Sequence, residues 1–147
     1  MSNQQKFPKG REQRPEKHYE PFKIDIEKMA DYNELVSKAE EFGKRLKDRN
    51  VKRSQFRRVF THIKKIQTNV ESKKLDKTAN IPGEILKEIL LLKPKMAYTA
   101  GRHTSIADFY DVVVKFVNGM KTVTEFNRFY DFVEATLAYH RFHGGKD

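Results

Sequence analysis

Apolar residues at helical spacing constrain the fold of this chain more than any other feature. Between residues 53 and 71 they are Phe56, Val59, Phe60, Ile63, Ile66 and Val70. At about 100° per residue, these side chains fall within about 120° of one another, as on one face of an amphipathic helix. No segment alternates apolar and polar residues for long enough to be a convincing strand. The sequence therefore predicts an all-α fold.

Start and stop signals place two more helices before residue 100. Residues 25–48 repeat the one-face apolar pattern. The polar stretch ESKKLDKTAN at 71–80 is expected to form a loop, and Pro82 suits the first position of the helix that follows. Apolar residues continue this helix through Leu92.

Two further helices are expected near the C-terminus. Ser105 is placed to cap the first of them, and Gly119 is placed to stop it. Thr122 and Glu125 have the spacing of a capping box, in which each residue satisfies a backbone N–H of the other. The glycine pair at 144–145 ends the helix that this box opens.

The first 22 residues lack helical periodicity. They hold Pro8, Pro15, Pro21 and Gly10 among mixed charges and few apolar residues, so burial could not offset the entropy of ordering them. We expect residues 1–22 to form a flexible tail and residues 23–147 to form a single compact bundle of about five helices.

The positive charge of the chain is concentrated in one segment. Residues 43–74 contain 12 Lys and Arg against Asp48 and Glu71, which accounts for the whole net charge of +10. In the projection of the helix at 53–71, the cations form a broad stripe opposite the apolar face. This arrangement favours binding to a polyanion, nucleic acid above all, over a solvated face whose charge is incidental.

The stretch LLKPKMAYTAGRH at 91–103 interrupts the next helix. Pro94 has no N–H and disfavours helical conformation at Lys93, which predicts a kink or a restart there. Lys93 and Lys95 then project near the break, and residues 101–103 are expected to form a turn that carries a guanidinium. Composition leaves open whether these cations bind phosphate or only offset a helix dipole.

Composition excludes several classes of protein. Without Cys the chain has neither disulfides nor thiolate metal sites, and a reducing cytoplasm is the expected location. No apolar run approaches the roughly 18 residues of a membrane span, and the N-terminus lacks the apolar core of a secretory signal. We expect an intracellular protein without contact to a membrane.

Catalytic and metal motifs are also missing from the sequence. His140 and His143 lie three residues apart but have no placed carboxylate to complete a metal site. Asp108, Asp111 and Asp131 are interpreted as ordinary solvated acids on helix faces. No glycine-rich phosphate loop and no nucleophile elbow occurs. We expect a binding protein that is not an enzyme and needs no cofactor or metal.

Three blocks resemble a known family. They are SQFRRVFTHIKKI at 54–66, LLKPKMAYTAGR at 91–102 and FYDFVEATLAYHRFHGG at 129–145. Together, and in this order, they look like the small, all-helical subunit of the type III-A CRISPR interference (Csm) complex. One difference lies at 52–53, where the family often has hydroxyl residues and this chain has Lys-Arg. Ser54 is then the alternative helix cap.

The resemblance implies a non-catalytic subunit of an RNA-guided complex for antiviral defence. Copies of such a subunit stack along the CRISPR RNA, beside the backbone and large subunits, and help to hold the target RNA. Because base pairing reads the sequence, the contacts of the small subunit must be sequence-independent. The residues expected to contact RNA are Arg53, Arg57, Arg58, Lys64, Lys65, Lys93, Lys95 and Arg102, with Arg128 and Arg141 as secondary candidates.

Three other functions stay open. A helical, dimeric DNA-binding regulator would use residues 53–71 as a recognition helix and would prefer one sequence. A metal-dependent nuclease would use His and acidic residues. A pure assembly protein would have no RNA contact. In the RNA-binding interpretation, apolar residues such as Phe56, Phe60, Leu90 and Tyr139 belong to the core or to subunit contacts. The sequence also leaves open self-association and whether Tyr98 stacks on a base.

Overall fold

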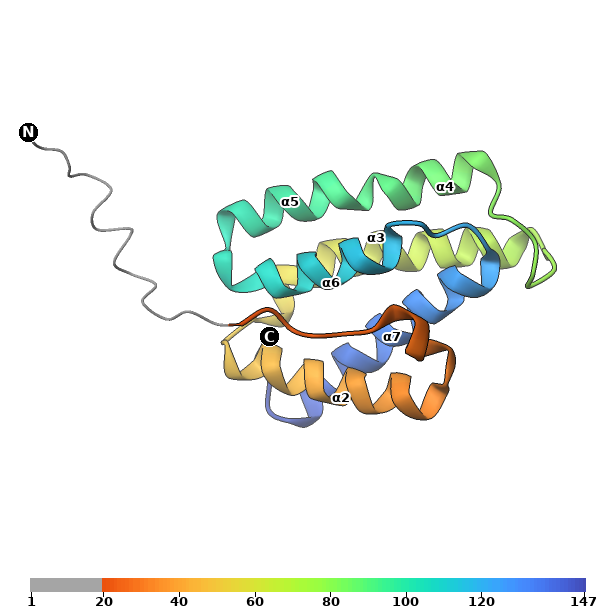
Figure 1. Ribbon diagram of the computed structural model, residues 1–147. Coiled ribbons are helices and arrows are strands. Elements are labelled where there is room, and N and C mark those ends of the chain that lie inside the picture. Colours follow the sequence, from red (N-terminus) through yellow and green to blue (C-terminus); the bar gives the residue numbers. More distant parts are fainter. Residues whose placement is uncertain (1–19) are drawn as a thin grey trace, which may run out of the picture.

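A computed structural model describes residues 20–147, so most of the expected tail at 1–22 lies outside the described residues. Within them the fold is all-α, as the sequence predicts, and the only β-type pairing is an isolated bridge between Asn80 and Thr122. Figure 1 shows α4 and α5 following one another along one side of the molecule and α2 on the opposite side. The elements are η2 (Ile26–Ala30), α2 (Tyr32–Asp48), α3 (Arg53–Ser72), α4 (Gly83–Leu90), α5 (Leu92–Arg102), η3 (Thr104–Ile106), α6 (Ala107–Val117) and α7 (Val123–Phe142).

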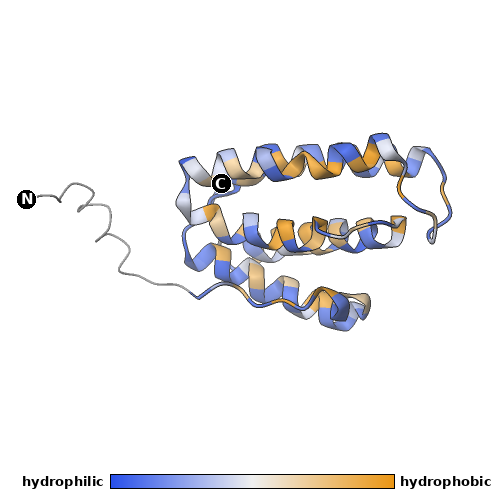
Figure 2. Ribbon diagram, turned by 45° about the horizontal axis from the view of Figure 1, so that its top comes forward, coloured by the Kyte–Doolittle hydropathy of each residue, from blue (hydrophilic) through white to orange (hydrophobic). Residues whose placement is uncertain are grey.

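One hydrophobic core joins these helices. The ring of Phe42 in α2 lies 6.0 Å from that of Phe132 in α7 and 6.4 Å from that of Phe109 in α6, measured between centroids. Phe22, the last residue of the expected tail, is also buried, and its ring lies 4.6 Å from that of Phe42. Figure 2 shows hydrophobic residues on the helix sides that face one another and hydrophilic residues outside. The core therefore takes in residues before 23.

The helix ends predicted at Gly119, Thr122 and Gly144 are confirmed. Thr122 Oγ1 accepts a hydrogen bond from the Glu125 N–H at 3.2 Å, and Glu125 Oε1 accepts one from the Thr122 N–H at 2.9 Å. Gly119 and Gly144 follow α6 and α7 with φ of 79° and 96°. This left-handed conformation strains residues with a Cβ, so glycine ends each helix there at little cost.

Two helix boundaries near the N-terminus differ from the prediction, because other residues cap the helices. The first expected helix is divided at Asp31, whose Oδ1 accepts a hydrogen bond from the Asn33 N–H at 2.9 Å and so caps α2. Ser54, the alternative cap of the next helix, lies inside α3. Lys52 is the N-cap instead, and its backbone N–H donates to Oε1 of Gln55 at 2.8 Å.

Pro82 and Ser105 also lie elsewhere than predicted. The sequence predicts Pro82 at the first helical position, but it is the N-cap of α4, and Gly83 is the first helical residue. Ser105 lies within η3, and α6 begins only after Ile106. The 3₁₀ turn joins α6 directly, so no extended residue is available there to act as a side-chain cap.

The break predicted around Pro94 is present, although it falls earlier. Helix α4 ends at Leu90 and α5 starts two residues later, so Pro94 is the third residue of α5, where a backbone N–H would have no partner in the helix. The turn predicted at 101–103 begins only at His103, because residues 101–102 complete α5. Counting α4 and α5 as one interrupted helix gives the expected five helices in the described residues.

Helices α2 and α7, which share the largest contact in the fold, approach closely at Gly43. A Cβ at this position would lie 2.7 Å from the backbone nitrogen of His140 and 2.7 Å from the backbone oxygen of Thr136. Backbone atoms inside a helix cannot rotate away. The contact therefore requires a residue without a side chain.

Replacing Gly43→Ala is expected to lower the free energy of unfolding by about 1–3 kcal/mol, because the added carbon overpacks this contact. Gly101→Ala is the matched control, since nothing lies within 4 Å of a Cβ there. Alanine is favoured over glycine in helices by about 0.5–1 kcal/mol, so the control should keep or gain stability. Urea unfolding curves measure both. Wild-type stability of Gly43→Ala would contradict the close approach of α2 and α7.

Candidate nucleic-acid interface

Helix α3 packs against α7 on one flank and against α4 and α5 on the other, and its outward side stays exposed. Phe56, Val59 and Ile63 fill the inner side and are at most 2% exposed. The outward side presents four cations that take part in no ion pair within residues 20–147. These are Arg57, Arg58, Lys64 and Lys65, all exposed.

The same outward side of α3 is almost free of acids. Glu71, in its last turn, is the one acidic residue of the helix. Thr61 and Thr68 lie between the cations, and each hydroxyl donates to the backbone oxygen four residues earlier, of Arg57 at 3.0 Å and of Lys64 at 3.1 Å. The surface thus consists of cations and hydroxyl groups along the helix axis.

Two grooves flank this surface. The groove between α3 and α7 is lined by Arg53 and Arg57 together with Arg141 of α7. The groove between α3 and the α4–α5 pair has a volume of about 490 Å³, and it brings Lys65 together with Lys95. Residues about 30 apart in the sequence therefore face the same space.

His62 lies in the second groove and was missed by the sequence analysis. Burial lowers the pKa of His62, and the nearby charges of Lys95, Lys65 and Arg58 lower it further. Since an unperturbed histidine has a pKa of about 6.5, this imidazole is neutral at pH 7. Its position three residues before Lys65 was the one available signal, because residues at this spacing share a helix face.

The structure separates Lys93 from Lys95. The ammonium of Lys93 donates to Oδ1 of Asn118 at 2.6 Å, at the end of α6, whereas Lys95 faces α3. Two residues along a helix are about 200° apart, which explains the separation. At the end of α5, the guanidinium of Arg102 lies over the ring of Tyr98, 5.9 Å from its centroid, and both side chains are exposed. Arg102 thus lies on the outside of the bundle.

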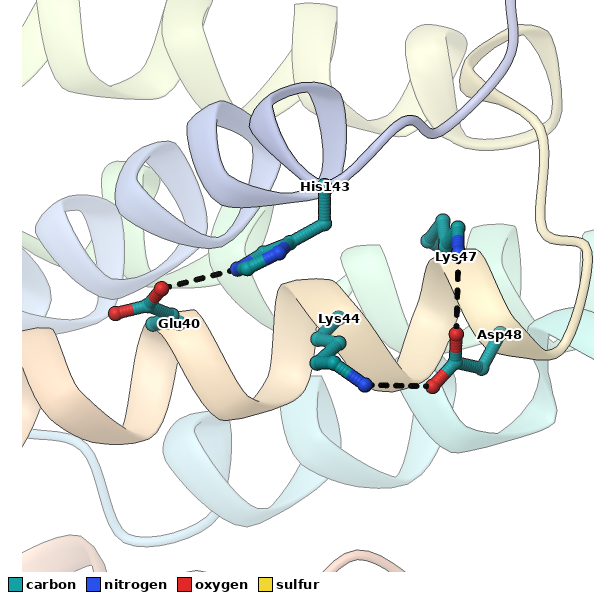
Figure 3. Close-up of polar contacts among 5 residues, drawn as sticks. All are labelled: Glu40, Lys44, Lys47, Asp48 and His143. Carbon is teal, nitrogen blue, oxygen red and sulfur yellow. Dashed lines mark hydrogen bonds and ion pairs between the residues drawn. The ribbon is translucent and has the colours of Figure 1, made fainter.

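The basic residues of α2 have acidic partners. Figure 3 shows Lys44 and Lys47 reaching Asp48, each at 3.4 Å. Arg45 of α2 and Arg49, the residue directly after this helix, both bind Oδ2 of Asp108 in α6.

The interpretation of Asp108 as a solvated acid is therefore wrong. The residue is 5% exposed and joins α6 to α2. An unpaired carboxylate would be costly to bury, so the two guanidiniums are needed there. Part of the basic segment at 43–74 thus has a structural role.

The two histidines at the end of α7 contact residues far away in the sequence. His140 is 2% exposed, and its Nε2 lies 2.7 Å from the carbonyl oxygen of Val51, which can only accept, so the ring donates. Nε2 of His143 lies 2.9 Å from Oε2 of Glu40 (Figure 3). The part of the chain that the structure describes contains no cluster of three or more His or acidic residues that could hold a metal. Nor does it contain a helix long and apolar enough to cross a membrane.

The fold and this surface define a small all-α protein with a concentrated basic face. The family model for the Csm2 subunit of type III-A matches residues 29–146. The chain therefore belongs to the Csm2 family of type III-A CRISPR small subunits, which confirms the resemblance of the three blocks. Members of this family are subunits of the Csm complex and are generally non-catalytic.

One curated relative is similar over about two thirds of the chain. It is the "CRISPR system Cms protein Csm2" of Streptococcus thermophilus, 25% identical over 96 residues, which are 64% of this chain and 74% of the relative. No solved structure matches the chain significantly.

Lys95→Gln is expected to raise the pKa of His62, because it removes a positive charge that disfavours the imidazolium. Lys93→Gln is the matched control and should leave this pKa unchanged, since Lys93 faces Asn118. NMR titration of the histidine ring protons measures both variants. Equal shifts in the two would show that Lys93 and Lys95 share one side of α5.

Proposed function

We propose that this chain is a non-catalytic subunit that holds the duplex of guide and target RNA in the type III-A complex, in the cytoplasm, beside the backbone and large subunits. The observation that carries the proposal is the outward side of α3. Arg57, Arg58, Lys64 and Lys65 project there without an ion pair in the described residues. Cations on one rigid helix face suit a phosphate backbone, whose charges repeat at regular intervals.

The chemistry of this face supports contacts that do not depend on sequence. An A-form duplex offers phosphates and 2′-hydroxyls, because its major groove is too deep and narrow for side chains. Cations supply the partners for phosphate, and the hydroxyls of Thr61 and Thr68 lie at the same face. The two grooves extend the contact on either side, through Arg53 toward α7 and through Lys95 toward α5. Arg102, exposed in the last turn of α5, is a further candidate for phosphate contact.

Replacing Arg57→Gln and Lys64→Gln together is expected to weaken duplex RNA binding by about tenfold at moderate salt. The plot of log affinity against log salt should also become shallower by about 1.5, since each lost phosphate contact removes somewhat less than one unit of slope. Fluorescence anisotropy across a salt series, with two unrelated RNA sequences, measures both quantities.

The control removes the same charge from another surface, through Lys28→Gln and Lys44→Gln on η2 and α2. This double variant should bind nearly as wild type. Equal loss in both double variants would show that only net charge matters. Strong preference for one sequence would contradict the proposal and favour a DNA-binding regulator.

RNA affinity is also expected to rise as the pH falls toward and below the ordinary histidine pKa of about 6.5. Phosphates bound beside His62 offset the cations that lower its pKa, so the pKa is higher in the complex and binding takes up a proton. The affinity gain develops between the bound-state and free-state pKa values, and it levels off below the lower one.

Other charged groups also face His62, and the control must separate their effects. Those of the groove are Lys65 of α3, Glu84, Lys87 and Glu88 of α4, and Lys95 of α5. His62→Gln should flatten this pH dependence, whereas His103→Gln, at an exposed histidine, should keep it. Retention of the full pH dependence in His62→Gln would contradict this linkage.

A further inference from the structure

The groove between α3 and α7 has the features of an anion site. Its volume is about 290 Å³, and its rim carries three guanidiniums, those of Arg53, Arg57 and Arg141. Phe60 and Leu137 supply apolar surface between them. Three arginines from two helices repel one another, so this arrangement favours a bound anion.

A carboxylate of the chain already lies at this rim. Oδ1 of Asp147 is 3.0 Å from Nη1 of Arg141 and 3.8 Å from Nη1 of Arg53, so a single oxygen bridges α7 and α3. All three side chains are more than half exposed. Exposed ion pairs contribute little to stability, because water screens them. The bridge can therefore open without disturbing the core.

Backbone contacts bring Asp147 to this position. The Gly145 N–H donates to the carbonyl oxygen of His140 at 2.7 Å, and the Arg53 N–H, at the start of α3, donates to that of Lys146 at 2.8 Å. Gly145 also packs on the His140 ring, since a Cβ there would lie 2.2 Å from a ring carbon. These backbone contacts hold the chain just before Asp147, so its carboxylate lies close to the two guanidiniums.

We propose that this groove binds a backbone phosphate of RNA and that Asp147 occupies the same position in the free protein. The inference rests on the proposed function. A carboxylate and a phosphodiester each present two oxygens to a guanidinium, so one replaces the other with similar geometry. RNA held on α3 raises the local concentration of phosphate at the groove, which favours the replacement.

The exchange changes the charge balance of the groove. In the free protein, three guanidiniums face the carboxylates of Glu134 and Asp147. Once Asp147 has left, only Glu134 of these two acids opposes them. Asp147 therefore competes with RNA, and its removal should strengthen binding.

Asp147→Asn tests this competition, with Glu41→Gln as the matched control. Glu41 is an exposed acid of α2 that pairs with Lys38, so its replacement raises the net charge equally but away from the groove. Asp147→Asn is expected to bind duplex RNA about two- to fivefold more tightly at low salt, the range that one exposed ion pair represents. Adding Arg141→Gln should abolish the gain. Equal affinities of Asp147→Asn and Glu41→Gln would overturn the proposal.

A second measurement does not depend on RNA. Titration of the full chain with inorganic pyrophosphate, followed by NMR of the backbone amides, should shift the signals of Arg53 and Asp147, at lower concentration in Asp147→Asn. If wild type shows these shifts but binds no RNA, the groove is an anion site and the proposed function fails. If RNA binds while pyrophosphate leaves both signals unchanged, the groove proposal fails alone.

Discussion

Helix α3 is held on one flank by α7 and on the other by the α4–α5 pair, and the position of the charged surface follows from this burial. Burying Phe56, Val59 and Ile63 contributes about 1.5–3 kcal/mol for each side chain relative to exposure. Because apolar residues fill the inner side, the cations of α3 lie on the outward side and on the rims of the two grooves. Repulsion between exposed charges is weak in water, about 1 kcal/mol at 4 Å, so packing wins.

The basic residues of α2 and α3 have different roles although they are adjacent in sequence. Arg45 of α2 and Arg49, the residue that caps its C-terminal end, compensate the buried carboxylate of Asp108 and so join α2 to α6. This cluster replaces solvation that burial removes, and its guanidiniums are not available to a ligand. The net charge of the segment therefore overstates the charge that a polyanion meets, and α3 supplies most of what remains.

Acidic residues line both grooves beside α3, and they lower the positive charge of the basic surface. Glu84 and Glu88 lie in the groove toward α5, and Glu134 lies in the groove toward α7. In the proposed function these acids keep the affinity of a single copy moderate, because a phosphate entering either groove must compete with carboxylates. The same proposal has several copies along one duplex bind firmly together, while each makes contacts that do not depend on sequence.

The sequence by itself determined the helices, the helix ends at Gly119, Thr122 and Gly144 and the basic side of α3, because apolar spacing and capping pairs such as Thr122 with Glu125 act within a few residues. The three blocks at 54–66, 91–102 and 129–145 also identified the family, which the match over residues 29–146 confirms. Tertiary structure alone decided which residues share a groove. Periodicity fixes the buried side of one helix but neither the neighbour that covers it nor the rotation across a break. Hence His62 with Lys95, the burial of Asp108 and the bridge from Asp147 could not be predicted, since each joins residues 33 or more positions apart.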